Sequence, residues 1–123
     1  MKRIIPNDIY LEKPCSMVAV GTAKGETDSR KLKIPEGLKA DGYLSLNNMT
    51  KYIKESLGKA KKVVYKRGER PLLREWVHSN IGKKAIVCCL GHFVYVDGRD
   101  YYSYFWNGGD EVVCVWILEG SNK

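Results

Sequence analysis

The sequence KAIVCCLGHFVYV, at residues 84–96, decides the fold that this chain can adopt. Its β-branched and aromatic residues predict two strands, at residues 85–90 and 92–96. Two more strands are expected at residues 101–106 and 112–118, since the turn sequences DGRD and NGGD separate the apolar runs. We therefore expect an antiparallel meander in the C-terminal part of the chain.

A short buried helix is expected well before these strands. Pro14 suits the first position of a helix, and small and apolar residues follow from Cys15 to Ala23. The pair Lys24-Gly25 is expected to end this helix. Residues 26–42 are polar and punctuated by Gly and Pro, which predicts an irregular connection able to flank or cover a cleft.

A second helix is the clearest in the chain. Ser45 can cap its start, Leu46, Met49, Ile53 and Leu57 recur at helical spacing, and Gly58 supplies the stop. A short strand at residues 62–66 and a third helix opened by Pro71 are expected next. Helices first and strands last predict an α+β fold, with the N-terminal helix packed on a C-terminal antiparallel sheet.

Length and composition indicate an ordinary globular protein. With 123 residues, the chain is long enough for one domain with a core, so we expect a single domain over residues 1–123. No apolar run approaches the ~18 residues of a membrane span. The basic start of the chain lacks the long apolar stretch of a secretory signal, and we therefore expect a cytoplasmic protein.

The four cysteines are expected to be reduced thiols. Cys88 and Cys89 are adjacent in a predicted strand, so their side chains should point to opposite faces of the sheet. Adjacent strand cysteines cannot both turn toward one metal ion, and the chain has no Cys-x-x-Cys pair. We expect neither a metal nor a cofactor.

Positive charge is concentrated in one stretch. Of the net charge of +7, residues 51–70 contribute +6, from eight basic residues against two glutamates. Such a stretch can bind nucleic acid, an anionic surface or an acidic partner. The alternative is an ordinary solvated surface, which the lack of a recognisable nucleic-acid motif favours.

Cys15 and His92 are the candidate catalytic residues. A thiol at a helix N-terminus lies near unpaired N–H groups and the positive end of the helix dipole, both of which favour thiolate. The thiolate can attack a carbonyl carbon, with backbone N–H groups holding the oxyanion and His92 acting as base. The structural alternatives are a small buried cysteine and a histidine that merely begins a strand.

A base of this kind needs an acceptor that fixes its tautomer. Asn107 is the first candidate, because the turn after the expected strand at residues 101–106 should return beside His92. Asp110, in the same turn, is the second candidate. His78, near the end of the third helix, is interpreted as a solvent-exposed or helix-terminus residue.

Three segments together carry a family resemblance: PCSMVAV at residues 14–20, LSLNNM at 44–49 and KKAIVCCLGHFVYV at 83–96. They resemble the compact papain-like cysteine peptidases, most closely the leader-processing domains of bacteriocin exporters, over residues 7–118. The resemblance implies a papain-like fold, a peptide or protein substrate, and a cysteine nucleophile, histidine base and orienting Asn or Asp. These roles fall on Cys15, His92 and Asn107.

Two positions depart from the family pattern. The family usually carries a glutamine six residues before the cysteine, where this chain has Ile9, and the chain contains no glutamine. Asn7 is the nearest possible substitute. Ser16 stands where the family commonly has glycine. The competing interpretation is a papain-like module that has lost activity and serves a binding or structural role, for instance in a phage particle, through its basic face.

Overall fold

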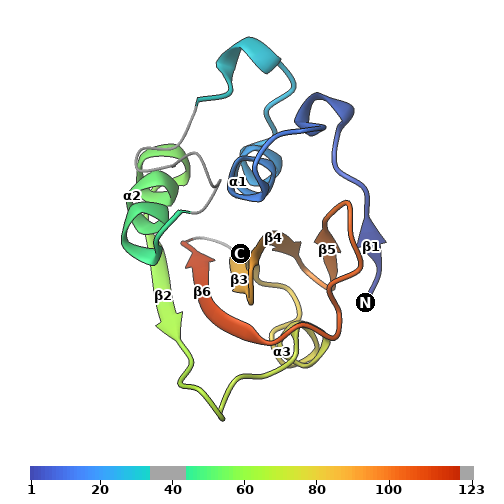
Figure 1. Ribbon diagram of the computed structural model, residues 1–123, viewed down its shortest axis with the longest axis vertical. Helices are drawn as coiled ribbons and strands as arrows, with labels where there is room; N and C mark the ends of the chain where they lie inside the picture. Colours follow the sequence, from blue (N-terminus) through green and yellow to red (C-terminus); the bar gives the residue numbers. More distant parts are fainter. Residues whose placement is uncertain (34–43, 120–123) are drawn as a thin grey trace.

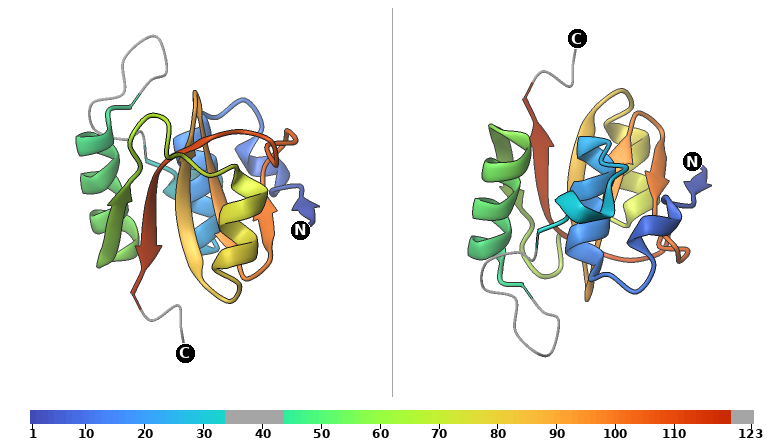
Figure 2. Two further views of the ribbon diagram at one scale, coloured as in Figure 1. Left: turned by 90° about the horizontal axis from the view of Figure 1, so that it is seen from below. Right: turned by 90° about the horizontal axis from the view of Figure 1, so that it is seen from above.

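The fold is a three-layer arrangement around one β-sheet. The computed structural model describes residues 1–33 and 44–119. Helices α1 (Cys15–Lys24) and α2 (Leu46–Leu57) lie on one face of the sheet, and helix α3 (Leu73–Ser79) lies on the other (Figure 1, Figure 2). The predicted α+β class, with the N-terminal helix packed on the sheet, is confirmed for this part of the chain. Each helix there is too short or too polar to cross a bilayer.

The sheet is mixed rather than a simple meander. Its strands lie in the order β1-β5-β4-β3-β6-β2, with β1 and β5 parallel and the other neighbours antiparallel. In chain order the strands are β1 (Arg3–Ile4), β2 (Ala60–Val64), β3 (Lys84–Cys89), β4 (His92–Asp97), β5 (Asp100–Tyr102) and β6 (Val112–Leu118).

The predicted meander is right for β3, β4 and β5 and wrong for β6. This last strand pairs with β3 instead of β5. Strand β3 lies in the buried centre of the sheet, where its backbone N–H and C=O groups need a strand partner on each side. The strand expected at residues 62–66 is β2, shifted toward the N-terminus by its register against β6. The short β1 was not expected, and it covers the outer edge of β5.

The strand expected at residues 101–106 ends early, at Tyr102. The hydroxyl of the next residue, Ser103, accepts a hydrogen bond from Phe105 N (3.1 Å) and donates one to Asn107 Oδ1 (2.7 Å). These bonds turn the chain out of the ladder. Since Tyr102 lies opposite Tyr95, β4 between His92 and Tyr95 is left without a strand partner on that side in the described sheet.

The helix boundaries follow local capping signals. Pro14 is the N-cap of α1 rather than its first residue, and Gly25 ends the helix in the left-handed conformation (φ 76°). Ser45 Oγ accepts a hydrogen bond from Asn48 N (3.2 Å) at the start of α2. Helix α3 begins two residues later than expected, since Leu72 is held extended in a bridge to Glu111. His78 is exposed in the last turn of α3, as expected.

Alternation along β3 divides the core between the two faces of the sheet. Ile86 packs with α1 and α2, whereas Ala85, Val87 and Cys89 pack with α3. Cys88 packs on the α1 and α2 side, so the prediction that Cys88 and Cys89 face opposite ways is confirmed. All four cysteines are free thiols.

Helix α1 is held in place by a close contact with the N-terminal segment. Tyr10, which ends the short helix η1 (Asp8–Tyr10), is 1% exposed and lies against Gly21. A Cβ at residue 21 would lie 2.5 Å from the tyrosine ring, so only glycine allows this approach. The Tyr10 hydroxyl also donates to Glu26 O (2.6 Å) beyond the end of α1. The position of α1 thus depends on Tyr10.

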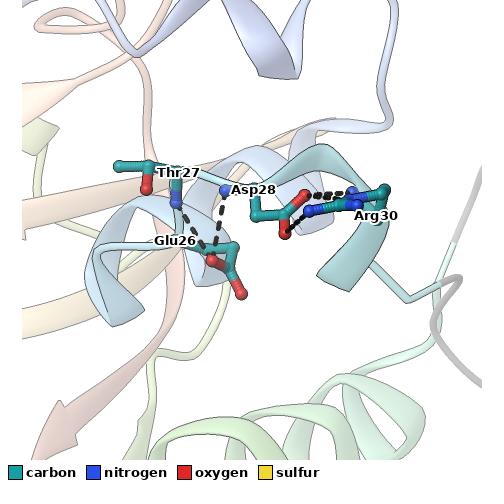
Figure 3. Close-up of polar contacts among 4 residues, drawn as sticks. All are labelled: Glu26, Thr27, Asp28 and Arg30. Atoms are coloured by element: carbon teal, nitrogen blue, oxygen red, sulfur yellow. Dashed lines mark hydrogen bonds and ion pairs between the residues drawn. The ribbon is translucent and has the colours of Figure 1, made fainter.

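The connection after α1 is ordered by two carboxylates (Figure 3). The Glu26 side chain accepts hydrogen bonds from Thr27 N (3.1 Å) and Asp28 N (3.2 Å). Asp28 then caps the short helix η2 (Ser29–Lys31) by accepting from Arg30 N, and its carboxylate pairs with the Arg30 guanidinium (3.0 Å). The rest of the predicted irregular connection, residues 34–42, lies outside the described residues.

Candidate active site

Cys15 is the first residue of α1, and its sulfur faces the start of β4. Phe93 N donates a hydrogen bond to Cys15 Sγ (3.4 Å). This N–H is available because β5 has already left the ladder at Tyr102, so the sulfur takes the place of a strand partner. The early end of β5 therefore creates the position that the thiol occupies.

His92 is the first residue of β4 and lines the same cavity as Cys15. The cavity has a volume of about 240 Å³. The structure therefore brings the two predicted catalytic residues together from opposite ends of the chain. The remaining lining residues are mainly apolar or aromatic: Lys13, Val18, Phe93, Tyr102, Ser103, Tyr104 and Phe105.

A chain of polar side chains begins at His92 and Ser103, in the lining of the cavity. His92 Nε2 lies 3.3 Å from Ser103 Oγ, and Ser103 Oγ donates to Asn107 Oδ1 (2.7 Å). Asn107 Nδ2 in turn donates to Asp110 Oδ2 (2.7 Å). We call these four residues the polar relay. The two candidates for the third residue thus belong to one chain of contacts, and Ser103 stands between them and His92.

The relay is carried by a loop that is fixed from several sides. Asn107 is 6% exposed, and its N–H donates to Tyr101 Oη (3.0 Å). The first turn of α3 also binds the loop, since Arg74 N donates to Gly108 O (3.1 Å) and Leu73 N to Asp110 O (2.9 Å). Such anchoring holds the amide and carboxylate of the relay at defined positions.

Electrostatics favour a neutral thiol and a neutral imidazole at rest. Burial raises the pKa of Cys15, although the Phe93 N–H and the N–H groups at the start of α1 act in the opposite direction. Burial lowers the pKa of His92, and the Asp110 carboxylate partly offsets this. The N–H groups at the helix start favour thiolate, as expected, but desolvation outweighs them and the net pKa of Cys15 is raised.

Asn7 does not replace the missing glutamine of the family pattern. Its side chain accepts a hydrogen bond from Ile9 N (3.1 Å) and caps η1, and its carbonyl accepts from Tyr104 Oη (2.6 Å). The groups near the sulfur that remain able to hold an oxyanion are the N–H groups of Cys15 and Ser16 in the first turn of α1. Lys13, at the cavity, is a further cationic group that the sequence reasoning did not single out.

The other three thiols lie in the core of the sheet. Cys88 and Cys114 are direct partners on β3 and β6, and Cys89 is fully buried on the α3 side. Burial raises the pKa of Cys88 to about 12 and that of Cys114 to about 11. These thiols provide an internal comparison for the reactivity of Cys15.

The basic stretch at residues 51–70 runs from α2 through β2 into the following loop. Within the described sheet, β2 pairs with β6 alone and is an edge strand. Seven of the eight basic side chains are exposed, and Arg70 is half-buried. The stretch is therefore accessible to a partner.

No protein-family model, curated protein or solved structure matches this chain.

Proposed function

We propose that the chain is a cysteine hydrolase that acts on peptides or proteins, with Cys15 as nucleophile and His92 as general base. One observation carries this proposal: Cys15 and His92 line one cavity. There the Cys15 sulfur accepts a hydrogen bond from Phe93 N–H, which has no partner from β5. The family resemblance of the sequence supports it independently. The α+β architecture, with the cysteine beginning the helix that packs on the sheet, is compatible with a papain-like fold.

The residues can perform acyl transfer in two steps. As the sulfur attacks a carbonyl carbon, the thiol proton passes to the His92 imidazole, and the N–H groups of Cys15 and Ser16 face the developing oxyanion. The imidazolium then gives this proton to the leaving amine, and the C–N bond breaks to leave a thioester on Cys15. Water, deprotonated by His92, hydrolyses the thioester and releases the carboxylate product and the free thiol.

Alkylation of the thiols tests the proposal without a known substrate. We expect iodoacetamide to modify Cys15 at least about tenfold faster than Cys88, Cys89 or Cys114 at pH 7.5. Cys89 and Cys114 are buried, and half-buried Cys88 lies outside the cavity that His92 lines, so the base serves only Cys15. Peptide mapping by mass spectrometry measures the four rates in one sample. Equal rates for Cys15 and Cys88 would contradict the proposal.

The pH profile of Cys15 alkylation should show the base directly. The His92 pKa lies below its usual 6.5. The imidazole is therefore neutral, and able to accept a proton, at every pH above this lowered pKa. The Cys15 pKa lies above its usual 9.0, so free thiolate contributes only at higher pH. We expect the alkylation rate of Cys15 to reach a plateau between the pKa of His92 and the pKa of Cys15. In His92→Ala the plateau should disappear and the alkaline rise remain, whereas His78→Ala should keep both.

The second candidate function is an inactive module that binds an anionic partner through the basic stretch. This function is favoured by exposed lysines on and beside the edge strand β2: Lys59, Lys61, Lys62 and Lys66. Reversal of these four charges to glutamate should leave the fold intact and weaken retention on a heparin column in a salt-dependent manner.

A matched control reverses four exposed basic residues elsewhere, Lys24, Lys31, Lys84 and Arg99. It makes the same change in net charge, so a smaller loss of retention in the control would assign binding to the basic stretch. Equal losses in the two variants would show that retention reflects net charge alone.

A further inference from the structure

We infer that Ser103 is a positioning residue, which holds His92 in the tautomer that carries its proton on Nε2 and leaves Nδ1 free to accept the thiol proton. The tautomer follows from the hydrogen bonds alone. The part played by the free nitrogen rests on the proposed function.

The direction of each hydrogen bond in the relay is determined by its far end. The ionised carboxylate of Asp110 can only accept, so the group of Asn107 that faces it at 2.7 Å is the amide NH₂. The amide oxygen of Asn107 therefore faces Ser103 and has to accept. The Ser103 hydroxyl has one proton, and it donates that proton to Asn107 Oδ1.

Because the Ser103 proton is used in the bond to Asn107, Ser103 Oγ can only accept further hydrogen bonds, through its two lone pairs. One accepts the hydrogen bond from Phe105 N (3.1 Å), and the other faces His92 Nε2 (3.3 Å). A lone pair facing an imidazole nitrogen is favourable only when that nitrogen bears a proton. Neutral His92 therefore carries its proton on Nε2, and Nδ1 is the nitrogen with a free lone pair.

Burial leaves the residues of the relay with few hydrogen-bond partners other than one another. Ser103 is 2% exposed and Asn107 is 6% exposed, so water cannot readily replace a missing partner at either residue. When His92 becomes charged, the Ser103 oxygen and, two residues further along the relay, the Asp110 carboxylate face the added charge. The anionic end of the relay thus favours the protonated imidazole against the effect of burial.

The test measures the tautomer by NMR, independently of catalysis. The chain has only two histidines, His92 and His78, so long-range ¹H–¹⁵N correlation spectra of ¹⁵N-labelled protein resolve both rings. At pH 7.5 we expect His92 to show a protonated Nε2 and an unprotonated Nδ1. Exposed His78 should show the averaged shifts of two exchanging tautomers and serves as internal control.

Ser103→Ala should move the His92 ¹⁵N shifts toward the averaged values and lower the rate of Cys15 alkylation at pH 7.5 by about twofold or more, since a mixture of tautomers leaves Nδ1 free in only part of the molecules. Ser103→Thr, which keeps the hydroxyl, should restore both. Asn107→Ala should move the His92 shifts further, toward the tautomer with its proton on Nδ1, since Ser103 can then donate its proton to Nε2. Should Ser103→Ala fail to fold, the tautomer in the wild-type protein decides the question.

A proton on Nδ1 of His92, or averaged shifts like those of His78, would overturn the inference. So would a Ser103→Ala protein in which the His92 shifts do not move. An Nε2–H tautomer that depends on Ser103, found together with a Cys15 thiol no more reactive than Cys88, would support the relay and contradict the hydrolase proposal. The two claims therefore fail separately.

Discussion

Cys15→Ala is expected to abolish the proposed hydrolysis, with a loss of turnover on the order of 10⁴-fold or more. The variant removes the thiol that shares a cavity with His92, so no covalent intermediate can form there. Turnover is measured on a proteome-derived peptide library, with cleavage products identified by mass spectrometry. The N-terminal residue of each new peptide then also reports which bond is cleaved.

Cys88→Ala is the matched control. Cys88 packs on the same face of the sheet as α1, is half-buried like Cys15, and has its sulfur next to Cys89 O (3.5 Å). This variant should keep turnover within about threefold of wild type, because Cys88 is outside the group of residues that line the cavity. Loss of cleavage in Cys88→Ala with retention in Cys15→Ala would assign the nucleophile to β3 and reject the proposed site.

Trp116→Ala should give the largest loss of stability, about 3–5 kcal/mol in the free energy of unfolding. Trp116 lies on β6, is 1% exposed, and packs among residues from α1, α2 and the sheet. Its indole N–H also donates to Thr50 Oγ1 (2.9 Å), which ties α2 to the sheet. The loss would be a large part of the ~5–15 kcal/mol that stabilises a typical domain.

Urea denaturation followed by circular dichroism measures this effect. Trp116→Phe should cost much less, about 1–2 kcal/mol, because it keeps most of the packing and loses the hydrogen bond. Trp106→Ala provides a second comparison at a side chain that is 64% exposed, where the loss should be below about 1 kcal/mol. Equal losses at residues 106 and 116 would be inconsistent with a core centred on β6.

The elements of this fold were predictable where their signals are local. The capping residues Ser45, Gly25 and Gly58 lie within a few positions of the helix ends that they determine. The place of β6 beside β3 was not predictable in this way, because it depends on which distant strands pair in the buried centre of the sheet. Alternating apolar residues predict a strand but do not indicate which other strand pairs with it.

The same distinction applies to the candidate site. Cys15 and His92 could be singled out because each begins a recognisable element, a helix and a strand. Ser103 could not, since its position depends on where β5 leaves the sheet, and the aromatic residues around it predict a longer strand. A small hydroxyl residue inside the run YYSYFW was the one available signal.

The contact between Tyr10 and Gly21 has a consequence for sequence variation. An alanine in place of a helical glycine ordinarily stabilises a helix by about 1 kcal/mol, but here the added Cβ would meet the tyrosine ring at 2.5 Å. Helix α1 would have to shift, and the thiol at its start would shift with it. Residues 10 and 21 should therefore change together among related sequences, with alanine at 21 accompanied by a smaller side chain at 10. A suppressor screen that starts from Gly21→Ala should recover changes at Tyr10.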